Sequence, residues 1–379
     1  MQPVSSSPPS RHQTAPQRIL IVRLGSLGDI LHTLPAVATL RRAFPAASLG
    51  WVVEERWSEL LAARGCAEGP RSPQKPLADT LHLVNTLGWR TAPFSDQTWK
   101  EALDAIRALR GVGYEVAVDF QGALKSALLA QLSGAPRRIG FAQPRERPAG
   151  LFYTQTVSSR YRHVVEQNLS LAEALAPHTP AVRRFDLPCD PAAEETCQAE
   201  LARRNLREFA ILNPGAGWGA KCWPPERYAQ VARALAEVGI ASLVNFGPGE
   251  EPLAKAVQDE SGGRAQPLVS SLGELIAFTR RARIFVGGDT GPMHLAVALR
   301  VPVVALFGPT DPARNGPYEP ASTTPSGLAA APRTVVLRSP ISPTSHARRP
   351  DPDPGLLAIT AAEVISAARR LLPRSAAGG

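Results

Sequence analysis

The sequence of 379 residues lacks any segment that would carry it across a membrane. No apolar run approaches the roughly 18 residues needed to span a bilayer. The first sixteen residues, MQPVSSSPPSRHQTAP, are polar and rich in proline and serine, and contain none of the roughly 7–15-residue apolar core of a signal peptide. We expect residues 1–16 to form a disordered tail on a cytoplasmic protein.

Cysteine is scarce and scattered. The chain has four cysteines, at positions 66, 189, 197 and 222, and the spacing of the nearest pair is not that of a metal site. Such cysteines are typical of reduced thiols in the cytoplasm and exclude a disulfide framework. We therefore expect no bound metal.

Positive charge outweighs negative charge, and the formal net charge is +9. This balance favours an anionic partner, although arginine is also enriched together with alanine, proline and glycine in proteins of GC-rich genomes. The sequence contains no zinc-finger spacing and no basic run interleaved with aromatic residues, so it indicates no nucleic-acid partner. We expect the partner to be a small anion or an anionic lipid headgroup.

Short apolar runs alternate with helical periodicity along most of the chain. This alternation predicts parallel strands joined by crossover helices. A stretch rich in proline, residues 176–191, separates two such series. The sequence therefore predicts an α/β protein with two Rossmann-like, doubly wound domains, 17–185 and 186–379, which face each other across a cleft. The predicted strands include 19–22, 48–54, 80–85, 115–119, 138–141, 209–212, 241–246, 284–286 and 303–307.

The first strand runs into a glycine turn and then a carboxylate. Gly25 and Gly28 are free to take positive φ and allow another group to approach the backbone closely. Asp29 follows at the strand–turn–helix junction, on the sheet edge where ligands bind in open α/β folds. The same position also suits a plain helix N-cap.

Two loops of the second domain suit a diphosphate. Residues 213–224, NPGAGWGAKCWP, place three glycines and Lys221 before a helix, so that backbone amides, helix dipole and ammonium converge. Plain turn usage explains these glycines equally well. The loop is neither a Walker A motif, since Cys222 follows the lysine, nor a G-x-G-x-x-G dinucleotide motif.

The second loop, residues 287–294, reads GGDTGPMH. Asp289 or Thr290 can cap the predicted helix 294–300, and the amides of Thr290 and Gly291 can point to an anion. His294 can donate to a phosphate or sugar oxygen, or be a structural histidine. A carboxylate facing two anion-suited loops predicts group transfer from a nucleotide-diphosphate donor, with Asp29 as general base.

Three segments carry a resemblance to a known family. GSLGDILHTLPA, DTGPMHLAVAL and FGPTDP stand in the order and spacing of the ADP-heptose:lipopolysaccharide heptosyltransferases, glycosyltransferase family 9, which the chain resembles from about Arg18 to Pro312. The stretches WVVEERW, VDFQGALKSALLA and RERPAGLFYTQTV resemble the type I enzymes, which add the first heptose to Kdo-lipid A. The resemblance implies the GT-B fold, with an N-terminal acceptor domain and a C-terminal nucleotide-sugar domain.

The resemblance also implies roles for individual residues. Asp29 is the base of an inverting, metal-independent transfer, Lys221 lies near the donor phosphate, and Ser270 lies where the adenine rests. The donor-binding loop is matched by Asp289, Thr290, Gly291 and His294, and the acidic residue near the ribose by Glu250 or Glu251. Ala216 and Gly217 stand where type I enzymes have two threonines, so backbone amides replace those hydroxyl contacts.

Basic residues of the first domain match no specific motif. Arg90, Lys125, Arg145 and Arg147 are candidates to hold the carboxylates of Kdo and the phosphates of lipid A. Each of them alone also fits an ordinary solvated surface charge. Residues 318–354 are rich in proline, serine and alanine, and we expect them to be irregular around one short strand.

The expected reaction transfers L-glycero-D-manno-heptose from ADP-heptose to Kdo-lipid A, with ADP-heptose as a substrate and no cofactor. Peripheral contact with the inner face of the inner membrane is expected from the net charge and the lipid acceptor. Two alternatives keep the fold: another nucleotide sugar or acceptor, as in type II enzymes, and a nucleotide-sugar-binding protein without activity. An oxidoreductase is disfavoured because the G-x-G-x-x-G motif with its downstream acid is missing.

Overall fold

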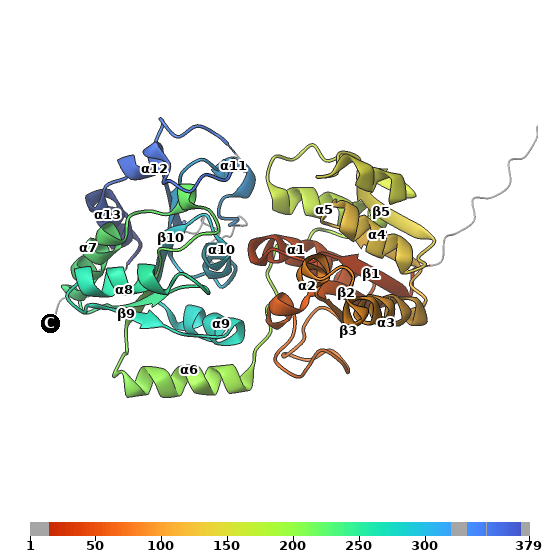
Figure 1. Cartoon of the computed structure of the whole chain (residues 1–379), viewed down its shortest axis with the longest axis horizontal. Helices are drawn as coiled ribbons and strands as arrows, with labels where there is room; N and C mark the ends of the chain where they lie inside the picture. Colours follow the sequence, from red (N-terminus) through yellow and green to blue (C-terminus); the bar gives the residue numbers. More distant parts are fainter. Residues whose placement is uncertain (1–14, 320–331, 346, 373–379) are drawn as a thin grey trace, which may run out of the picture.

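The structure is a computed structural model that describes residues 15–319, 332–345 and 347–372. The tail expected at residues 1–16 lies outside the described residues except for its last two. Figure 1 shows two α/β halves side by side, each built around its own twisted sheet.

The first sheet is parallel throughout. Its strand order is β3-β2-β1-β4-β5-β6, and every neighbouring pair runs in the same direction. The strands are β1 (Arg18–Val22), β2 (Ser48–Glu54), β3 (Thr80–Val84), β4 (Val116–Asp119), β5 (Arg137–Phe141) and β6 (Gln155–Val157).

Helices cover both faces of this sheet. In β1, Ile19 and Ile21 pack into the layer of α1 and α5, whereas Leu20 and Val22 pack into the layer of α3 and α4. A strand buried on both faces needs an unbroken apolar run, which is the pattern in the sequence. The elements of this half are α1 (Leu27–Ala43), the 3-10 turn η1 (Glu55–Leu60), α2 (Thr86–Thr91), α3 (Asp96–Val112), α4 (Leu124–Leu132), the 3-10 turn η2 (Arg147–Phe152) and α5 (Val164–Leu175).

The second sheet is also parallel, with the order β12-β11-β10-β7-β8-β9. Its strands are β7 (Phe209–Asn213), β8 (Ala241–Asn245), β9 (Ala265–Leu268), β10 (Ile284–Gly288), β11 (Val303–Phe307) and β12 (Thr334–Arg338). The surrounding elements are α6 (Pro191–Arg203), η3 (Gly219–Lys221), α7 (Pro225–Ala236), α8 (Glu251–Glu260), α9 (Leu272–Arg281), α10 (Gly291–Ala298), α11 (Pro312–Asn315), α12 (Pro354–Ala358) and α13 (Ala361–Leu371).

Several elements differ from the sequence prediction. The stretch expected to be a linker, 176–191, has no helix or strand up to residue 190, but α6 begins at Pro191, where Asp190 caps it by accepting from the amides of Ala192 and Ala193. The helix expected at 294–300 begins three residues earlier, at Gly291, because Pro292 suits a first helical turn. Helix α5 and strands β6 and β9 were not predicted either, but both halves keep the predicted alternation of parallel strands and crossover helices.

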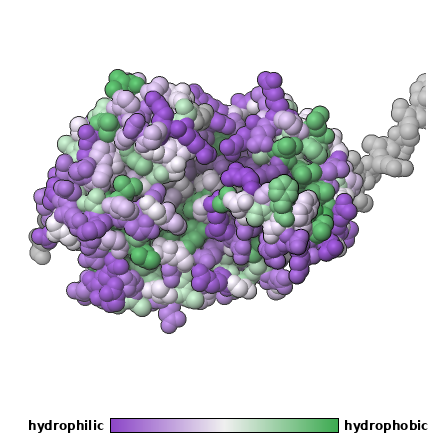
Figure 2. Space-filling view, viewed as in Figure 1, coloured by the Kyte–Doolittle hydropathy of each residue, from purple (hydrophilic) through white to green (hydrophobic). Residues whose placement is uncertain are grey.

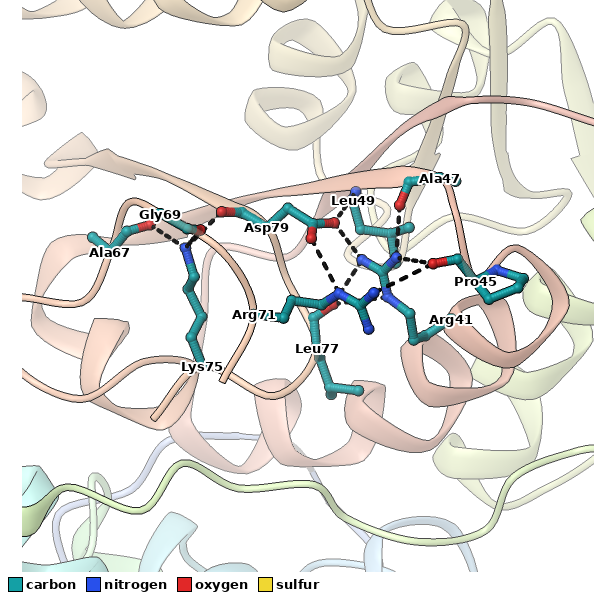
Figure 3. A network of polar contacts seen from close by, with 10 residues as sticks. All are labelled: Arg41, Pro45, Ala47, Leu49, Ala67, Gly69, Arg71, Lys75, Leu77 and Asp79. Carbon is teal, nitrogen blue, oxygen red and sulfur yellow. Dashed lines mark hydrogen bonds and ion pairs between the residues drawn. The ribbon is translucent and has the colours of Figure 1, made fainter. Parts of the chain in front are cut away.

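A buried polar network fastens the long segment between η1 and β3 (Figure 3). Lys75 is 1% exposed, and its ammonium donates to the carbonyls of Ala67, Gly69 and Asp79 at 3.1, 2.7 and 2.6 Å. The Asp79 carboxylate pairs with Arg41 of α1 and accepts from the amide of Leu49 at 2.7 Å. The network closes the amino-terminal edge of the first sheet, opposite the edge at which β1 leads into Asp29.

The two halves contact each other directly. The apolar core of the first half continues through α1 and η1 to Leu275 of α9 and Leu295 of α10. Glu59 of η1 accepts from the amide of Gly273 at 2.6 Å, and Arg162 pairs with Asp311 at 2.8 Å. None of the helices in the described residues is long and apolar enough to cross a membrane.

Candidate active site

Asp29 is held in the first turn of α1 with one side open. Its Oδ2 accepts from the amide and hydroxyl of Ser26 at 3.1 and 3.2 Å, and its Oδ1 lies 2.7 Å from Nη2 of Arg23. Ser26 is the N-cap of α1, so the interpretation of Asp29 as the N-cap is wrong. Because 34% of its side chain stays exposed, this fixed carboxylate can still reach a ligand.

Arg23, which pairs with Asp29, follows β1 and is held by the loop after β4. The buried Arg23 guanidinium donates to the carbonyl of Phe120, and the amide of Leu24 donates to Oε1 of Gln121 at 2.9 Å. The sequence analysis assigned no role to Arg23 or Gln121. A polar residue directly after a strand, in DFQG, was the available signal for Gln121.

The two glycines before Asp29 allow neighbouring side chains to approach the backbone closely. Neither Gly25 nor Gly28 has a positive φ, contrary to the expectation. A Cβ on Gly28 would lie 2.9 Å from Cδ2 of His294, and a Cβ on Gly291 would lie 2.8 Å from the Leu27 side chain. The first turns of α1 and α10 therefore touch through two glycines, which brings Asp29 to the start of α10.

In the second half, a lysine and a buried carboxylate form the centre of the site. Lys221 ends η3, and its Nζ lies 2.7 Å from Oδ2 of Asp289 and 3.2 Å from the Asp289 carbonyl. Burial alone would raise the pKa of Asp289, but the hydrogen bond with His294 and the charge of Lys221 outweigh it and lower that pKa well below its ordinary range. Asp289 is thus ionised and neutralised locally by Lys221.

A pair of histidines extends this cluster to α1. Nε2 of His294 lies 3.3 Å from Oδ1 of Asp289, and its Nδ1 lies 3.2 Å from Nε2 of His32. Because a carboxylate only accepts, His294 donates from Nε2 to Asp289, and a second hydrogen bond joins the two histidine rings. Burial, and then the neighbouring His294 and His163, lower the pKa of His32 well below its usual value, so this ring stays neutral. The sequence analysis missed His32, although it follows Asp29 by three residues.

The glycine loop after β7 is only partly open. A Cβ on Gly215 would meet the Glu250 carboxylate at 2.1 Å, and one on Gly219 would meet the Pro350 carbonyl at 1.5 Å. A Cβ on Gly217 would meet no atom of the described residues within 4 Å, and Ala216 beside it is half-buried. The expectation that all three glycines form an open phosphate cradle is therefore wrong for Gly215 and Gly219, which are required by close packing.

The segment 318–354 contributes to this loop, which the sequence did not indicate. The amide of Ala220 donates to the Arg349 carbonyl at 3.0 Å, and the amide of Asp353 donates to the Ala220 carbonyl at 3.3 Å. The guanidinium of Arg348 lies 5.7 Å from the Trp218 ring centroid, and Nζ of Lys221 lies 4.6 Å from it. Two cations thus stand beside one aromatic ring at the edge of the candidate site.

The other predicted residues lie at the same carboxyl edges of the two sheets. Glu250 accepts from the amide of Gly247 at 2.8 Å, whereas Glu251 is exposed in the first turn of α8. Ser270 follows β9, is half-buried and makes no hydrogen bond within the residues that the structure describes. Thr290 is the N-cap of α10, and its hydroxyl lies 3.4 Å from Nδ2 of Asn213.

On the first half, Lys125 and Arg90 differ in their surroundings. Lys125, in the first turn of α4, donates to Oγ1 of Thr86 at 2.9 Å and lies 3.6 Å from Oε1 of Glu54. Arg90 in α2 is exposed and has no ion-pair partner among the described residues. Asp29, Lys125 and Arg90 therefore share one edge of the sheet, but they form no direct contact.

The arrangement can perform a specific kind of chemistry. An open carboxylate from one half stands next to the contact with the first turn of α10, whose unpaired amides carry positive partial charge. A lysine, a histidine and a second helix start belong to the same half as α10. This combination suits removal of a proton at Asp29 while a phosphate group leaves on the opposite side.

Comparison with known proteins gives a consistent result. The model of glycosyltransferase family 9 (heptosyltransferase) matches residues 103–335, more than half of the chain. The chain is 30% identical over 306 residues to lipopolysaccharide heptosyltransferase 1 of Escherichia coli (strain K12), covering 79% of this chain and 91% of that protein. It is 30% identical over 318 residues to the protein of the same name from Pseudomonas aeruginosa, covering 79% and 81%.

Solved structures agree with this. The E. coli heptosyltransferase WaaC with ADP matches with a TM-score of 0.73 at 26% identity, over 93% of this chain and 99% of that chain. The E. coli ADP-heptose lps heptosyltransferase II shares the fold, with a TM-score of 0.69 at 20% identity over 93% and 98%. The predicted GT-B fold and glycosyltransferase class are confirmed, and the oxidoreductase alternative is wrong. The chain belongs to glycosyltransferase family 9, the heptosyltransferases.

Proposed function

We propose that this glycosyltransferase moves L-glycero-D-manno-heptose from ADP-heptose to Kdo-lipid A during synthesis of the lipopolysaccharide inner core. The relatives named lipopolysaccharide heptosyltransferase 1 and the solved structures with ADP and ADP-2-deoxy-2-fluoro heptose support this assignment. The observation that carries it is the contact between the first turns of α1 and α10, where Gly28, next to Asp29, approaches His294 of the cluster that also contains Lys221 and Asp289.

In the proposed reaction Asp29 acts as general base. Its carboxylate takes the proton of an acceptor hydroxyl while that oxygen attacks the anomeric carbon of the heptose. The bond from this carbon to the diphosphate oxygen breaks, ADP leaves with the electron pair, and the configuration inverts. Arg23 and Ser26 keep the carboxylate in one orientation through this step.

The second half, residues 186–379, takes the donor in this proposal. Lys221 and the amides of Thr290 and Gly291 stabilise the charge that develops on the leaving diphosphate. Glu250, held between Gly215 and Gly247, binds the ribose hydroxyls in preference to the exposed Glu251. Ser270 contacts the adenine, and the backbone of Ala216 and Gly217 faces the phosphates. Asp289 positions Lys221 and His294.

The first half, residues 17–185, takes the acceptor. Lys125 and Arg90 contact its anionic groups, and the lipid acceptor together with the net charge of +9 supports peripheral attachment at the inner face of the inner membrane. A second candidate function is transfer of a different sugar from its nucleotide, or transfer of heptose to a different acceptor. Gly217 favours it, because the space around this residue leaves the donor sugar less closely specified.

Release of ADP from ADP-heptose, with and without Kdo-lipid A, tests the proposal. Asp29→Asn should lower the acceptor-dependent rate by about 10²–10⁴-fold and leave the affinity for ADP unchanged. Asp259→Asn, which removes an exposed carboxylate from α8, serves as the matched control and should keep the wild-type rate. Near-normal turnover by Asp29→Asn would contradict the base assignment, and acceptor-independent release would favour the second candidate.

A further inference from the structure

Large apolar side chains are exposed on the outer helical layer of the first half. Phe94 is 93% exposed, Leu151 86% and Trp99 59%. In Figure 2, green side chains lie over the half of the molecule that contains α2, α3 and α4 in Figure 1. The further members of this set are Leu87, Leu103, Leu124 and Leu128. We call these seven residues the apolar rim.

The topology brings the apolar rim to one edge of the sheet. Leu87 lies in α2, which follows the carboxyl end of β3, and Phe94 lies between α2 and α3. Leu124 lies in the first turn of α4, after β4, and Leu151 lies in η2, after β5. Helix α3 contacts both α2 and α4, and α4 contacts η2, so the layer is continuous. The apolar rim thus lies along the edge that also holds Asp29.

Within the helices, the exposed residues share faces. Trp99 and Leu103 are four residues apart in the first two turns of α3, and Leu124 and Leu128 have the same spacing in α4. Residues four apart lie one above the other on a helix. Each helix therefore presents a short apolar stripe to the solvent near the acceptor edge, and its buried residues, such as Leu109 and Leu129, pack inward.

Cationic side chains are interspersed with the apolar rim, and three nearby carboxylates accept hydrogen bonds from protein groups. Oε2 of Glu146 accepts from the amide of Leu124 at 2.8 Å, Glu101 binds Trp89 and Gln97, and Asp104 pairs with Arg107. Asp96 in the first turn of α3 is a further exposed carboxylate, but exposed cations outnumber exposed carboxylates on this surface. The exposed cationic residues are Arg90, Lys100, Lys125, Arg145 and Arg147.

We propose that the apolar rim and these cations form the surface by which the enzyme docks on an anionic phospholipid bilayer. The proposal rests on the proposed function, since docking this edge would present the headgroup of a lipid acceptor to Asp29. Apolar side chains would enter the boundary between headgroups and acyl chains, and the cations would bind lipid phosphates. The core of a protein–protein interface is depleted in lysine, although arginine is enriched there. Lysine and arginine beside exposed Trp, Phe and Leu are the pattern of surfaces that lie at the headgroup level of a bilayer, so we commit to a bilayer as the partner.

Vesicle sedimentation with the full chain tests the surface directly. Wild type should bind vesicles of phosphatidylcholine with phosphatidylglycerol, and bind weakly to phosphatidylcholine alone or in about 0.5 M salt. Phe94→Ser with Leu151→Ser should lower the partition coefficient about tenfold or more, since each removes a large apolar group that the docked protein would bury in the bilayer. Val238→Ser with Ile341→Ser, which alters two exposed residues of the second half, should leave it unchanged.

The following results distinguish failure of the proposed docking surface from failure of the proposed function. The Phe94/Leu151 variant should lose transfer to acceptor in vesicles and keep transfer to a deacylated, water-soluble Kdo acceptor. Wild-type transfer to vesicle acceptor without binding to acceptor-free anionic vesicles would overturn the docking surface and leave the function standing. Vesicle binding that depends on the apolar rim, without transfer to any Kdo acceptor, would support the surface and overturn the function. A dimer that the double variant dissociates would overturn the surface in favour of self-association.

Discussion

Acidification should destabilise the first half, and the buried His82 accounts for a part of this effect that can be measured separately. His82 of β3 is 8% exposed, its Nε2 lies 2.7 Å from Oη of Tyr114, and burial lowers its pKa to about 4. In the unfolded chain the pKa of histidine is about 6.5, so between these values the unfolded state binds a proton that the folded state does not. The contribution of His82 to the free energy of unfolding is therefore fully present above pH about 6.5 and is lost as the pH falls. At about 1.4 kcal/mol per pH unit, about 2 kcal/mol is lost by pH 5.

Urea unfolding followed by tryptophan fluorescence at pH about 7.5 and about 5 measures this loss. His82→Gln cannot take up the proton, so its free energy of unfolding should fall by about 2 kcal/mol less than that of wild type. The buried His32 and the half-buried His163, whose pKa values are also lowered, titrate in both proteins and cancel in the comparison. His178→Gln, at an exposed position, should follow wild type. The reasoning fails if His82→Gln and wild type lose equal stability.

Three further outcomes follow from the site. Lys221→Ala should raise the Kd for ADP about tenfold to a hundredfold in calorimetry, the worth of a contact to a charged group, and unchanged affinity would remove Lys221 from the phosphate site. Gly28→Ala, which helix propensity alone would make stabilising, should lower the melting temperature and slow transfer, because its Cβ would lie 2.9 Å from Cδ2 of His294; a more stable, fully active variant would show that this approach is dispensable. Excess EDTA should leave the rate of ADP release unchanged, and a rate restored by added metal would contradict metal-independent transfer.

The parts of the fold that could be predicted are those that bury apolar residues on both faces. Strands β1, β7 and β11 are wholly apolar at their centres. A short, unbroken apolar run bounded by turn residues is typical of a strand buried on both faces. Helix α6 was missed because only Ala193 and Cys197 are buried in it, so it carries no apolar stripe. Strand β9, AQPL, was missed because a glutamine and a proline interrupt the run.

The candidate site was predictable to the extent that it obeys the topology of parallel sheets. Asp29, Lys221 and Asp289 each follow a strand, and carboxyl ends of parallel strands meet at one edge. The contacts that orient these residues were not predictable, because they join distant positions. His32 reaches His294 across 262 residues, and Arg349 reaches Ala220 through a segment without periodicity.

Three carbonyl oxygens accept hydrogen bonds from the ammonium of Lys75, much as backbone carbonyl oxygens coordinate a potassium ion in a selectivity filter. The segment 61–79 thus carries its own internal cation, and its conformation needs no ion from solution. An amine-reactive reagent can modify Lys75 only after this segment opens, so the rate of labelling reports the local unfolding of the segment. The segment follows η1, whose Glu59 accepts from the amide of Gly273 in the second half, so its opening begins beside a contact between the two halves.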